Sequence, residues 1–427
     1  MANVVFRLSG DEGAANKLKG IYSICSAHPW VLGAAMKQAL DDGTPLLIES
    51  TSNQVDQFGG YTGMKPADFV RFVHLIADHV GLPRSRLILG GDHLGPNAWR
   101  SLPAKEAMQR AEALIDAYVS AGFTKIHLDT SMSCADDPAR LSDDVVAARA
   151  SRLCAIAEAA AGREGRSEKP VYIIGTEVPV PGGAAEELAT VEVTHPEAAL
   201  DTVAIHRNAW QERGLDHAWQ RVIALVVQPG VEFDHTKVVD YQPQLATKLS
   251  GVLEQLPGMV FEAHSTDYQK PESLAVLVRD GFAILKVGPG VTFALREALY
   301  ALSDIEAELV APDARSNLRD VVERVMISKP GNWEKYYHGD DQEKRLLRTY
   351  SYSDRVRYYW ADPEVDASAR KLIGNLTALT ISENLLSRFL PAQYWQFRRG
   401  LIDASPMSLI QSKVREVIGV YAAACKA

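Results

Sequence analysis

Residues 86–96, RLILGGDHLGP, join an apolar run to two polar, titratable side chains, Asp92 and His93, at the point where the run ends. The same order recurs along the chain as far as about residue 300: an apolar run of strand length, then polar groups, then a helical pattern. Continuous apolar strands are typical of a parallel sheet that helices cover on both faces. The stretch therefore predicts a parallel α/β protein whose polar groups gather at the strand ends.

Eight such runs alternate with helix-like segments. Eight strands in this alternation predict a (β/α)8 TIM barrel over residues 1–300. An open, doubly wound sheet is the alternative architecture, because a strand count does not prove that a sheet closes. The runs begin at Gly20, Pro45, Arg86, Thr124, Val171, Arg221, Gly258 and Phe282.

The pattern changes after residue 300. Residues 301–427 read as helices with no further strand signal, and they include an aromatic-rich stretch at residues 332–360. We expect a helical C-terminal extension that packs on the barrel. Within it, Ser353 and Asp354 are candidate caps for a helix that begins with DRVRYYW.

Composition limits the classes of function. Of the 427 residues, 47% are apolar and 23% are charged, which is typical of a globular protein. The net charge of −9 argues against nucleic acid or an anionic membrane as the main partner. We find no segment with the pattern of a signal peptide or a membrane span. The absence of CxxC spacing makes a reducing cytoplasm the expected location for the four cysteines, Cys25, Cys134, Cys154 and Cys425.

Three histidines that follow apolar runs are candidate metal ligands: His93, His235 and His264. Three neutral imidazoles with an open fourth position would form a catalytic zinc site. Only the barrel would bring them together, because they are far apart in sequence. A helix cap or a surface position is the alternative for each, most strongly for His235. A buried carboxylate–histidine pair is the alternative for Asp92 and His93, although the glycines around them would let a ligand approach closely.

Three carboxylates are candidate acids and bases: Asp92, Asp129 and Glu177. A carboxylate next to a metal ligand can act as a base toward a substrate that the metal holds. A carboxylate at a strand end can also orient a metal-bound imidazole or cap a helix, and for Asp129 the cap is an equal alternative. Glu177 precedes PVPGG, a turn that could fold over the site.

The eighth unit, AILKVGPGVTFALRE at residues 283–297, predicts a phosphate site. Free amides at a helix start after the last barrel strand commonly bind phosphate. A plain Gly-Pro turn with a lysine ion pair is the alternative. The expected donors are Lys286, Gly288 and Thr292, with Ser265 and Thr266 from the turn after the seventh strand.

The segment after the second strand is expected to line the substrate pocket. Glu49, Asn53 and Gln54 would line the pocket and bond sugar hydroxyls. The glycine-rich residues from Phe58 to Pro66 would form a mobile lid, and their spacing does not match a P-loop.

Long stretches of the chain resemble the GatZ/KbaZ-like family, the Z subunits of tagatose-bisphosphate aldolase systems. Described members include a non-catalytic subunit that stabilises a class II aldolase, and enzymes that interconvert D-tagatose 6-phosphate and D-fructose 6-phosphate by inverting carbon 4. The resemblance rests on ICSAHP, IESTSNQVDQFGGYTGMKPADF, LILGGDHLGPN, AGFTKIHLDTSMSCADDP, GTEVPVPGG, VVQPGVEFDH, EAHSTDYQ, FAILKVGPGVTFALREA and YSYSDRVRYYW.

GGDHLG also resembles the metal-binding turn of class II aldolases. That resemblance implies that Asp92 handles protons and that His93 binds zinc. It further implies His235 and His264 as the other ligands, with Gly288 and Thr292 at a phosphate.

Two hypotheses follow. The first is a metal-dependent 4-epimerase that cleaves and re-forms the C3–C4 bond of a ketose phosphate, with zinc as the expected metal. The second is a catalytically silent partner of a class II aldolase. We reject the kinase function in older names of the family, because no nucleotide phosphate cradle with magnesium carboxylates is recognisable. Arg355, Arg357 and Tyr358 could pair with phosphate at the barrel mouth, or form the interface of a homo-oligomer.

Overall fold

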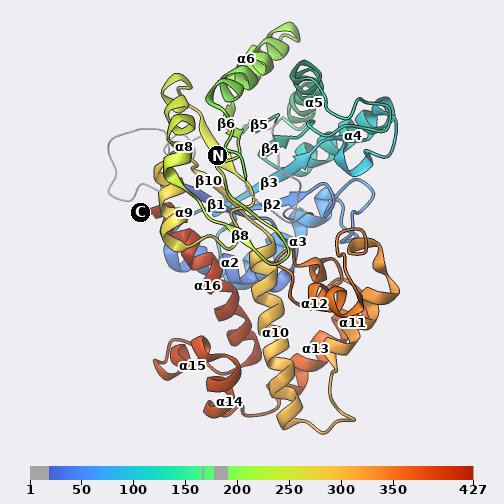
Figure 1. Cartoon of the computed structure of the whole chain (residues 1–427), viewed down its shortest axis with the longest axis vertical. Helices are drawn as coiled ribbons and strands as arrows, with labels where there is room; N and C mark the ends of the chain where they lie inside the picture. The colour runs from blue at the N-terminus through green and yellow to red at the C-terminus, as the bar shows by residue number, and fades with distance from the viewer. Residues whose placement is uncertain (1–18, 166–167, 177–190, 427) are drawn as a thin grey trace.

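The computed structural model describes residues 19–165, 168–176 and 191–426. Within these residues, eight parallel strands close into a barrel in the order β1-β10-β9-β6-β5-β4-β3-β2 (Figure 1). This confirms the predicted (β/α)8 barrel. The open sheet is wrong, because β1 pairs with both β2 and β10. The barrel strands are β1 (Ile21–Ile24), β2 (Leu46–Thr51), β3 (Leu87–Leu94), β4 (Lys125–Leu128), β5 (Val171–Ile174), β6 (Val222–Val226), β9 (Val260–Ala263) and β10 (Ile284–Val287).

Each of the eight predicted apolar runs contains one barrel strand. Helices cover the outside of the barrel, and a short antiparallel pair, β7 (Glu232–Phe233) and β8 (Val238–Val239), extends the loop after β6. The helices between strands are α2 (Pro29–Asp42), α3 (Pro66–Val80), α4 (Ala104–Ala121), α5 (Asp143–Arg163), α6 (Pro196–Glu212), α7 (Asp216–Trp219), α8 (Pro243–Ser250) and α9 (Pro271–Arg279).

The barrel interior is built in layers, because side chains alternate between the two faces of each strand. The first inward position of most strands is apolar, and these residues form a small core of their own around Ile21, Leu47, Ile88 and Ile284. The next inward positions are charged: Glu49, Lys125, Glu262 and Lys286, all buried. The apolar layer therefore closes one end of the barrel, and the polar layers lie toward the carboxyl ends of the strands.

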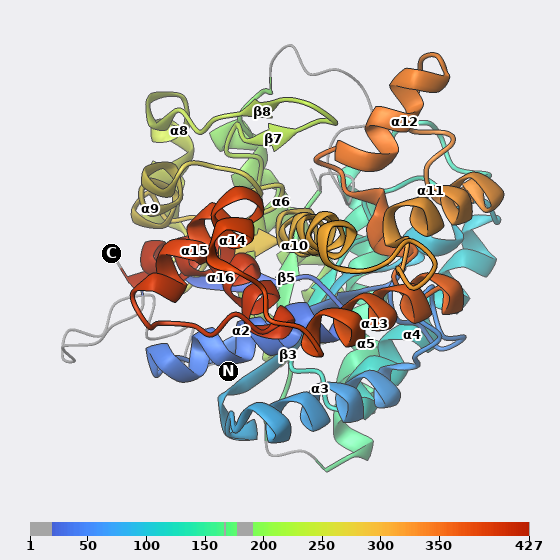
Figure 2. The ribbon, with the colours of Figure 1, turned by 90° about the horizontal axis from the view of Figure 1, so that it is seen from below.

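The C-terminal residues fold back on the barrel (Figure 2). Helix α10 (Pro289–Leu309) runs through residue 300, so the boundary proposed there stays a prediction. The last helix, α16 (Pro406–Lys426), contacts α2, α9 and α10. Between them lie α11 (Leu318–Ser328), α12 (Asp341–Tyr350), α13 (Pro363–Thr377), α14 (Glu383–Phe389) and α15 (Pro391–Arg398).

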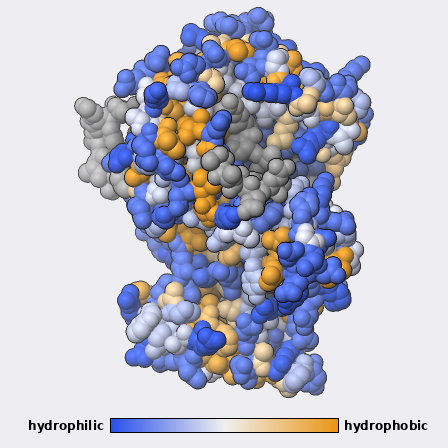
Figure 3. Space-filling view, viewed as in Figure 1, coloured by the Kyte–Doolittle hydropathy of each residue, from blue (hydrophilic) through white to orange (hydrophobic). Residues whose placement is uncertain are grey.

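The helix expected at DRVRYYW is only one 3-10 turn, η5 (Arg355–Tyr358). Asp354 does not cap it with its side chain, because the Asp354 carboxylate pairs with Arg296 of α10 at 3.0 Å. The face of the molecule in Figure 3 is mostly hydrophilic, with small apolar patches. No helix in the described ranges is long and apolar enough to cross a membrane.

Gly95 lies where the end of β3 meets the chain after β4. A Cβ atom on Gly95 would lie 1.7 Å from the backbone oxygen of Asp129, and one on Gly90 would lie 2.5 Å from Glu49 Oε1. The glycines around Asp92 and His93 are therefore required by packing inside the fold, a reason other than the ligand approach that we expected.

We predict that Gly95→Ala destabilises the protein by about 1–3 kcal/mol or more, because the new methyl group must displace backbone. Gly162→Ala in α5 is the matched control, since its added Cβ has no atom within 4 Å. That substitution should stabilise the helix by roughly 0.5–1 kcal/mol. Urea unfolding measures both. A Gly95→Ala protein as stable as the wild type would show that the two segments are not in close contact.

Candidate active site

A pocket opens at the carboxyl ends of the barrel strands and encloses about 650 Å³, part of it open to solvent. Its wall comes from β2, β3, β7 and β10, from the residues that follow β1, β2, β9 and β10, and from η5 of the helical extension. The predicted site residues that line it are Asn53, Gln54, Asp92, His93, His264, Ser265, Lys286 and Gly288. The other predicted residues lie behind this lining or elsewhere, and Glu177 lies outside the described residues.

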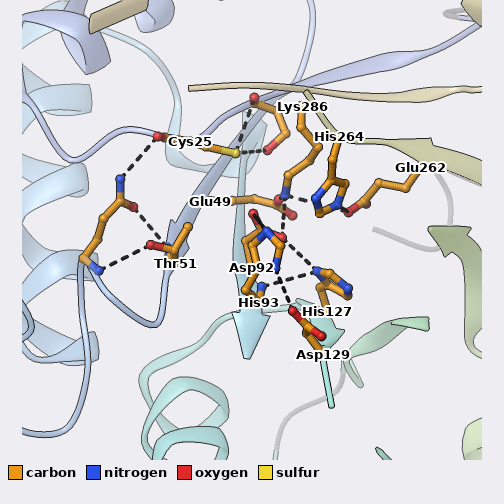
Figure 4. Close-up of polar contacts among 12 residues, drawn as sticks. Cys25, Glu49, Thr51, Asp92, His93, His127, Asp129, Glu262, His264 and Lys286 are labelled. Carbon is orange, nitrogen blue, oxygen red and sulfur yellow. Dashed lines mark hydrogen bonds and ion pairs between the residues drawn. The ribbon is translucent and has the colours of Figure 1, made fainter. Parts of the chain in front are cut away.

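Three imidazoles meet at the floor of the pocket (Figure 4). The ring centroid of His93 lies 5.0 Å from that of His264 and 5.3 Å from that of His127. The rings of His127 and His264 are 5.3 Å apart. All three side chains are buried. The structure thus brings two of the predicted ligands, His93 and His264, together with His127, which the sequence analysis missed.

His235 is not part of this cluster. Its Nε2 atom lies 2.9 Å from the backbone oxygen of Tyr336, and its Nδ1 atom lies 3.2 Å from Ser351 Oγ. The ring also packs edge-on against Tyr337. Both ring nitrogens therefore form hydrogen bonds to the helical extension, which is a structural role.

Asp92 connects the imidazoles to the charged layer beneath them. Its Oδ1 atom lies 2.9 Å from His127 Nδ1 and 3.0 Å from Lys286 Nζ. Its Oδ2 atom lies 3.7 Å from His93 Nε2. Burial by itself would raise the pKa of Asp92, but the surrounding imidazoles, His93 first, hold that pKa well below its usual range. Asp92 is therefore an anion.

An irregularity in β3 lets the side chains of Asp92 and His93 face the same cavity. The register of β3 against β4 shifts between Gly91 and Leu94, and His93 has a φ of 50°. A bulge of this kind redirects side chains that would otherwise point to opposite faces. Without it, only one of the two residues would face the pocket.

Asp129 orients His93. The two side chains meet at 2.8 Å between Asp129 Oδ2 and His93 Nδ1, and Asp129 Oδ1 accepts hydrogen bonds from the backbone and hydroxyl of Ser131. Burial would lower the pKa of His93, but Asp92 and Asp129 outweigh it and raise that pKa to about 9. With no metal bound, the His93 ring therefore carries both protons at neutral pH.

Four buried charges lie directly beneath the imidazoles. Lys125 Nζ contacts Glu49 and lies 2.6 Å from Glu262 Oε2, while Lys286 Nζ contacts Glu49 and Asp92. Glu262 Oε1 in turn lies 3.0 Å from His264 Nε2. Each lysine is compensated by carboxylates, so the amine of Lys286 is not free for a phosphate as predicted.

The predicted phosphate cradle is filled by a carboxylate of the chain itself. Asp267 Oδ1 accepts hydrogen bonds from the amides of Gly288 (3.0 Å) and Gly290 (2.7 Å) at the start of α10. The Thr266 hydroxyl donates to the backbone oxygen of Lys286 at 2.6 Å, and the Thr292 hydroxyl donates to that of Pro289 at 3.1 Å. These donors are used within the fold, because Asp267 occupies the place that an anion would take at this helix start.

The donor atoms at the floor suit a divalent metal. One atom each from Asp92, His127, Glu262 and His264 lie within 4.8 Å of one another, and all four residues are buried. His127 Nε2 has no hydrogen-bond partner among the described residues. Mixed imidazole and carboxylate ligands are typical of zinc. A second group, Cys25, Glu49 and Asp92, already surrounds the ammonium of Lys286.

Some residues that the sequence analysis missed could have been predicted from the alternation of side chains along a strand. His127 stands two positions before the candidate Asp129, and Glu262 stands two positions before the candidate His264. Lys125 stands two positions before His127. The period of two along a strand would have placed them on the same face. Arg357 and Tyr358, which we left unassigned, also line the pocket.

The expected lid from Phe58 to Pro66 contributes Tyr61 to the pocket lining. The ring of Tyr61 meets that of Tyr358 at 4.9 Å between centroids, and Thr62 donates a hydrogen bond of 2.7 Å to the backbone oxygen of Gln54. The segment thus borders the pocket, and its motion stays a prediction.

Comparisons with known proteins give a family model and solved structures that are similar to this chain. The solved structure of a probable tagatose 6 phosphate kinase from Sinorhizobium meliloti 1021 is 54% identical, with a TM-score of 0.88, over 95% of this chain and 100% of that chain. A fructose-bisphosphate aldolase from Campylobacter jejuni is 13% identical, with a TM-score of 0.44, over 84% of this chain and 88% of that chain. The family model described as D-tagatose-1,6-bisphosphate aldolase subunit GatZ/KbaZ-like matches residues 10–426. The protein therefore belongs to the GatZ/KbaZ-like family.

Proposed function

We propose that this chain is a metal-dependent epimerase that interconverts D-tagatose 6-phosphate and D-fructose 6-phosphate at carbon 4. The observation that carries the proposal is a cluster of three buried imidazoles with Asp92: His93, His264 and Asp92 line one pocket, and the His127 ring lies 5.3 Å from both other rings. Such a set costs stability unless it is paired, and a subunit that only stabilises a partner does not need it. The four cysteines are free thiols, which supports a reaction in the cytoplasm.

We assign the metal, with zinc as the expected ion, to His127, Glu262, His264 and Asp92. His127 and Glu262 replace His235, because both ring nitrogens of His235 bond the extension. Asp92 joins the ligands in place of His93, since one of its carboxylate oxygens lies within 4.8 Å of a ligand atom of each of the other three. When bound, the ion would polarise the carbonyl oxygen at carbon 2 of the ketose.

His93 is then the group that moves the proton, oriented by Asp129. With Asp92 committed to the metal, His93 would lose the charge that most raises its pKa, and its neutral ring would take the proton from the hydroxyl on carbon 4. The C3–C4 bond breaks, its electron pair forms the enolate of carbons 2 and 3, and carbon 4 becomes an aldehyde. The aldehyde turns its other face to carbon 3, the bond re-forms, and His93 returns the proton to the oxygen on carbon 4. No oxidant is needed, whereas direct removal of the C4 hydrogen would require one because that hydrogen is not acidic.

The second candidate is a non-catalytic subunit of a class II tagatose-bisphosphate aldolase, which the description of the family supports. Incubation of the purified chain alone with D-tagatose 6-phosphate and zinc separates the two. We expect D-fructose 6-phosphate, detected by ¹³C NMR. If none forms with any divalent metal, and an added aldolase becomes more stable in the presence of the chain, the subunit function holds instead.

We predict that His264→Ala loses bound metal and turnover together, because it removes a ligand at the centre of the cluster. His235→Ala is the matched control, since that histidine bonds only the extension and its neighbours there. Metal content by mass spectrometry of the dialysed proteins measures the difference. Full metal content in His264→Ala, or its loss in His235→Ala alone, would reverse our ligand assignment.

We predict that Asp129→Asn keeps its metal but lowers kcat by about 10²–10⁴-fold, because His93 loses the carboxylate that orients its ring. Asp129 raises the pKa of His93, so its removal lowers that pKa. The rise in kcat/KM with pH that reports His93 as a base should therefore move to lower pH. An unchanged pH profile would exclude His93 as the proton carrier.

A further inference from the structure

The pocket has a candidate phosphate site apart from the start of α10, at Arg357, one of the residues of the extension that could pair with phosphate. Lys286 is neutralised by Glu49 and Asp92, and the first amides of α10 are bonded to Asp267. A ketose phosphate nevertheless brings a dianion into the pocket. Among the described residues, the other lysine or arginine in the pocket lining is Arg357, which the helical extension contributes.

Arg357 is bonded only to neutral groups. Its Nη1 atom donates to the backbone oxygens of Ser353 and Asp354, and its Nη2 atom donates to the hydroxyl of Tyr358 at 2.9 Å. Among the residues that the structure describes, no carboxylate oxygen lies within 4.0 Å of its guanidinium, in contrast to the buried Arg296. Asp267 and Asp354 lie close enough to interact with Arg357 electrostatically, but neither forms an ion pair with it. A half-buried guanidinium that is not paired to a carboxylate is well suited to bind phosphate.

The fold holds this guanidinium at the pocket by a buried ion pair. Arg296 of α10 meets Asp354 at 3.0 Å, and their side chains are 2% and 0% exposed. Asp354 has a φ of 43°, an unfavourable conformation for a residue with a side chain. This strained residue directly precedes η5, so the pair fixes where Arg357 and Tyr358 enter the pocket.

We propose that Arg357 binds the phosphate of a ketose monophosphate, and that Asp267 excludes a second phosphate from the start of α10. This inference rests on the proposed epimerase function. The phosphate on carbon 6 belongs to the aldehyde fragment. Arg357 would therefore hold that fragment while its carbonyl group rotates and presents its other face to carbon 3. Carbons 2 to 4 would then reach the imidazoles at the floor of the same pocket.

Calorimetric titration of the zinc-loaded protein with D-fructose 6-phosphate and with D-fructose tests the site. Arg357→Gln should weaken binding of the phosphate ester by about 10- to 100-fold and leave the weak binding of D-fructose unchanged. Arg355→Gln is the matched control: Arg355 does not line the pocket, although its guanidinium lies 5.9 Å from the ring centroid of Tyr358. Arg355 stacks on Tyr336 and donates to the backbone oxygen of Asn332. This variant should bind the ester as the wild type does.

Arg357→Lys keeps the charge and should retain most of the preference for the ester, which guards against a folding defect in the glutamine variant. Wild-type affinity for the ester in Arg357→Gln, or an equal loss for D-fructose, would overturn the proposal. So would wild-type binding of D-fructose 1,6-bisphosphate at least tenfold tighter than that of the 6-phosphate. Because these readouts measure binding, they stand even if the chain turns over no substrate, and a failure of the epimerase proposal is seen separately.

Discussion

The site depends on the compensation of charges buried inside the barrel. Lys125 and Lys286 lie buried among Glu49, Glu262 and Asp92. The loss of any one member leaves an unpaired charge in a medium of low dielectric constant, which costs about 3–5 kcal/mol. The network therefore fixes the carboxylates of Asp92 and Glu262 in place, and these two bond the imidazoles of the pocket floor.

The carboxylates of this network have two kinds of cationic partner in one pocket. Where Glu49 and Asp92 meet, the compensating cation is the lysine ammonium. One step closer to the mouth, Asp92 and Glu262 meet imidazoles, which can give up a proton to a metal. At the mouth, the helical extension adds the guanidinium of Arg357, which has no carboxylate oxygen of the described residues within 4.0 Å. In our proposal, the lysines at the bottom compensate the carboxylates, the imidazole layer above them holds the metal, and Arg357 at the mouth binds the phosphate.

The architecture could be predicted from the sequence, because each apolar run is long enough to be one buried strand and a helix follows it. Asp92, His93 and His264 were found for the same reason: they stand where strands end. His235 was predicted as a ligand because it also follows a strand. It lies in the turn between β7 and β8, however, and this turn contacts the helical extension. His127 and Glu262 were missed because they lie within strands. The Asp267 carboxylate at α10 depends on a contact between two loops, which no local pattern encodes.

The central claim is that the imidazoles and carboxylates at the pocket floor hold one divalent ion. Anomalous X-ray diffraction from zinc-soaked crystals, recorded on both sides of the zinc absorption edge, tests it most directly. We predict a single strong peak within bonding distance of His127, Glu262 and His264. A peak elsewhere, or an empty floor at saturating zinc with Lys286 still paired to Asp92, would contradict the account.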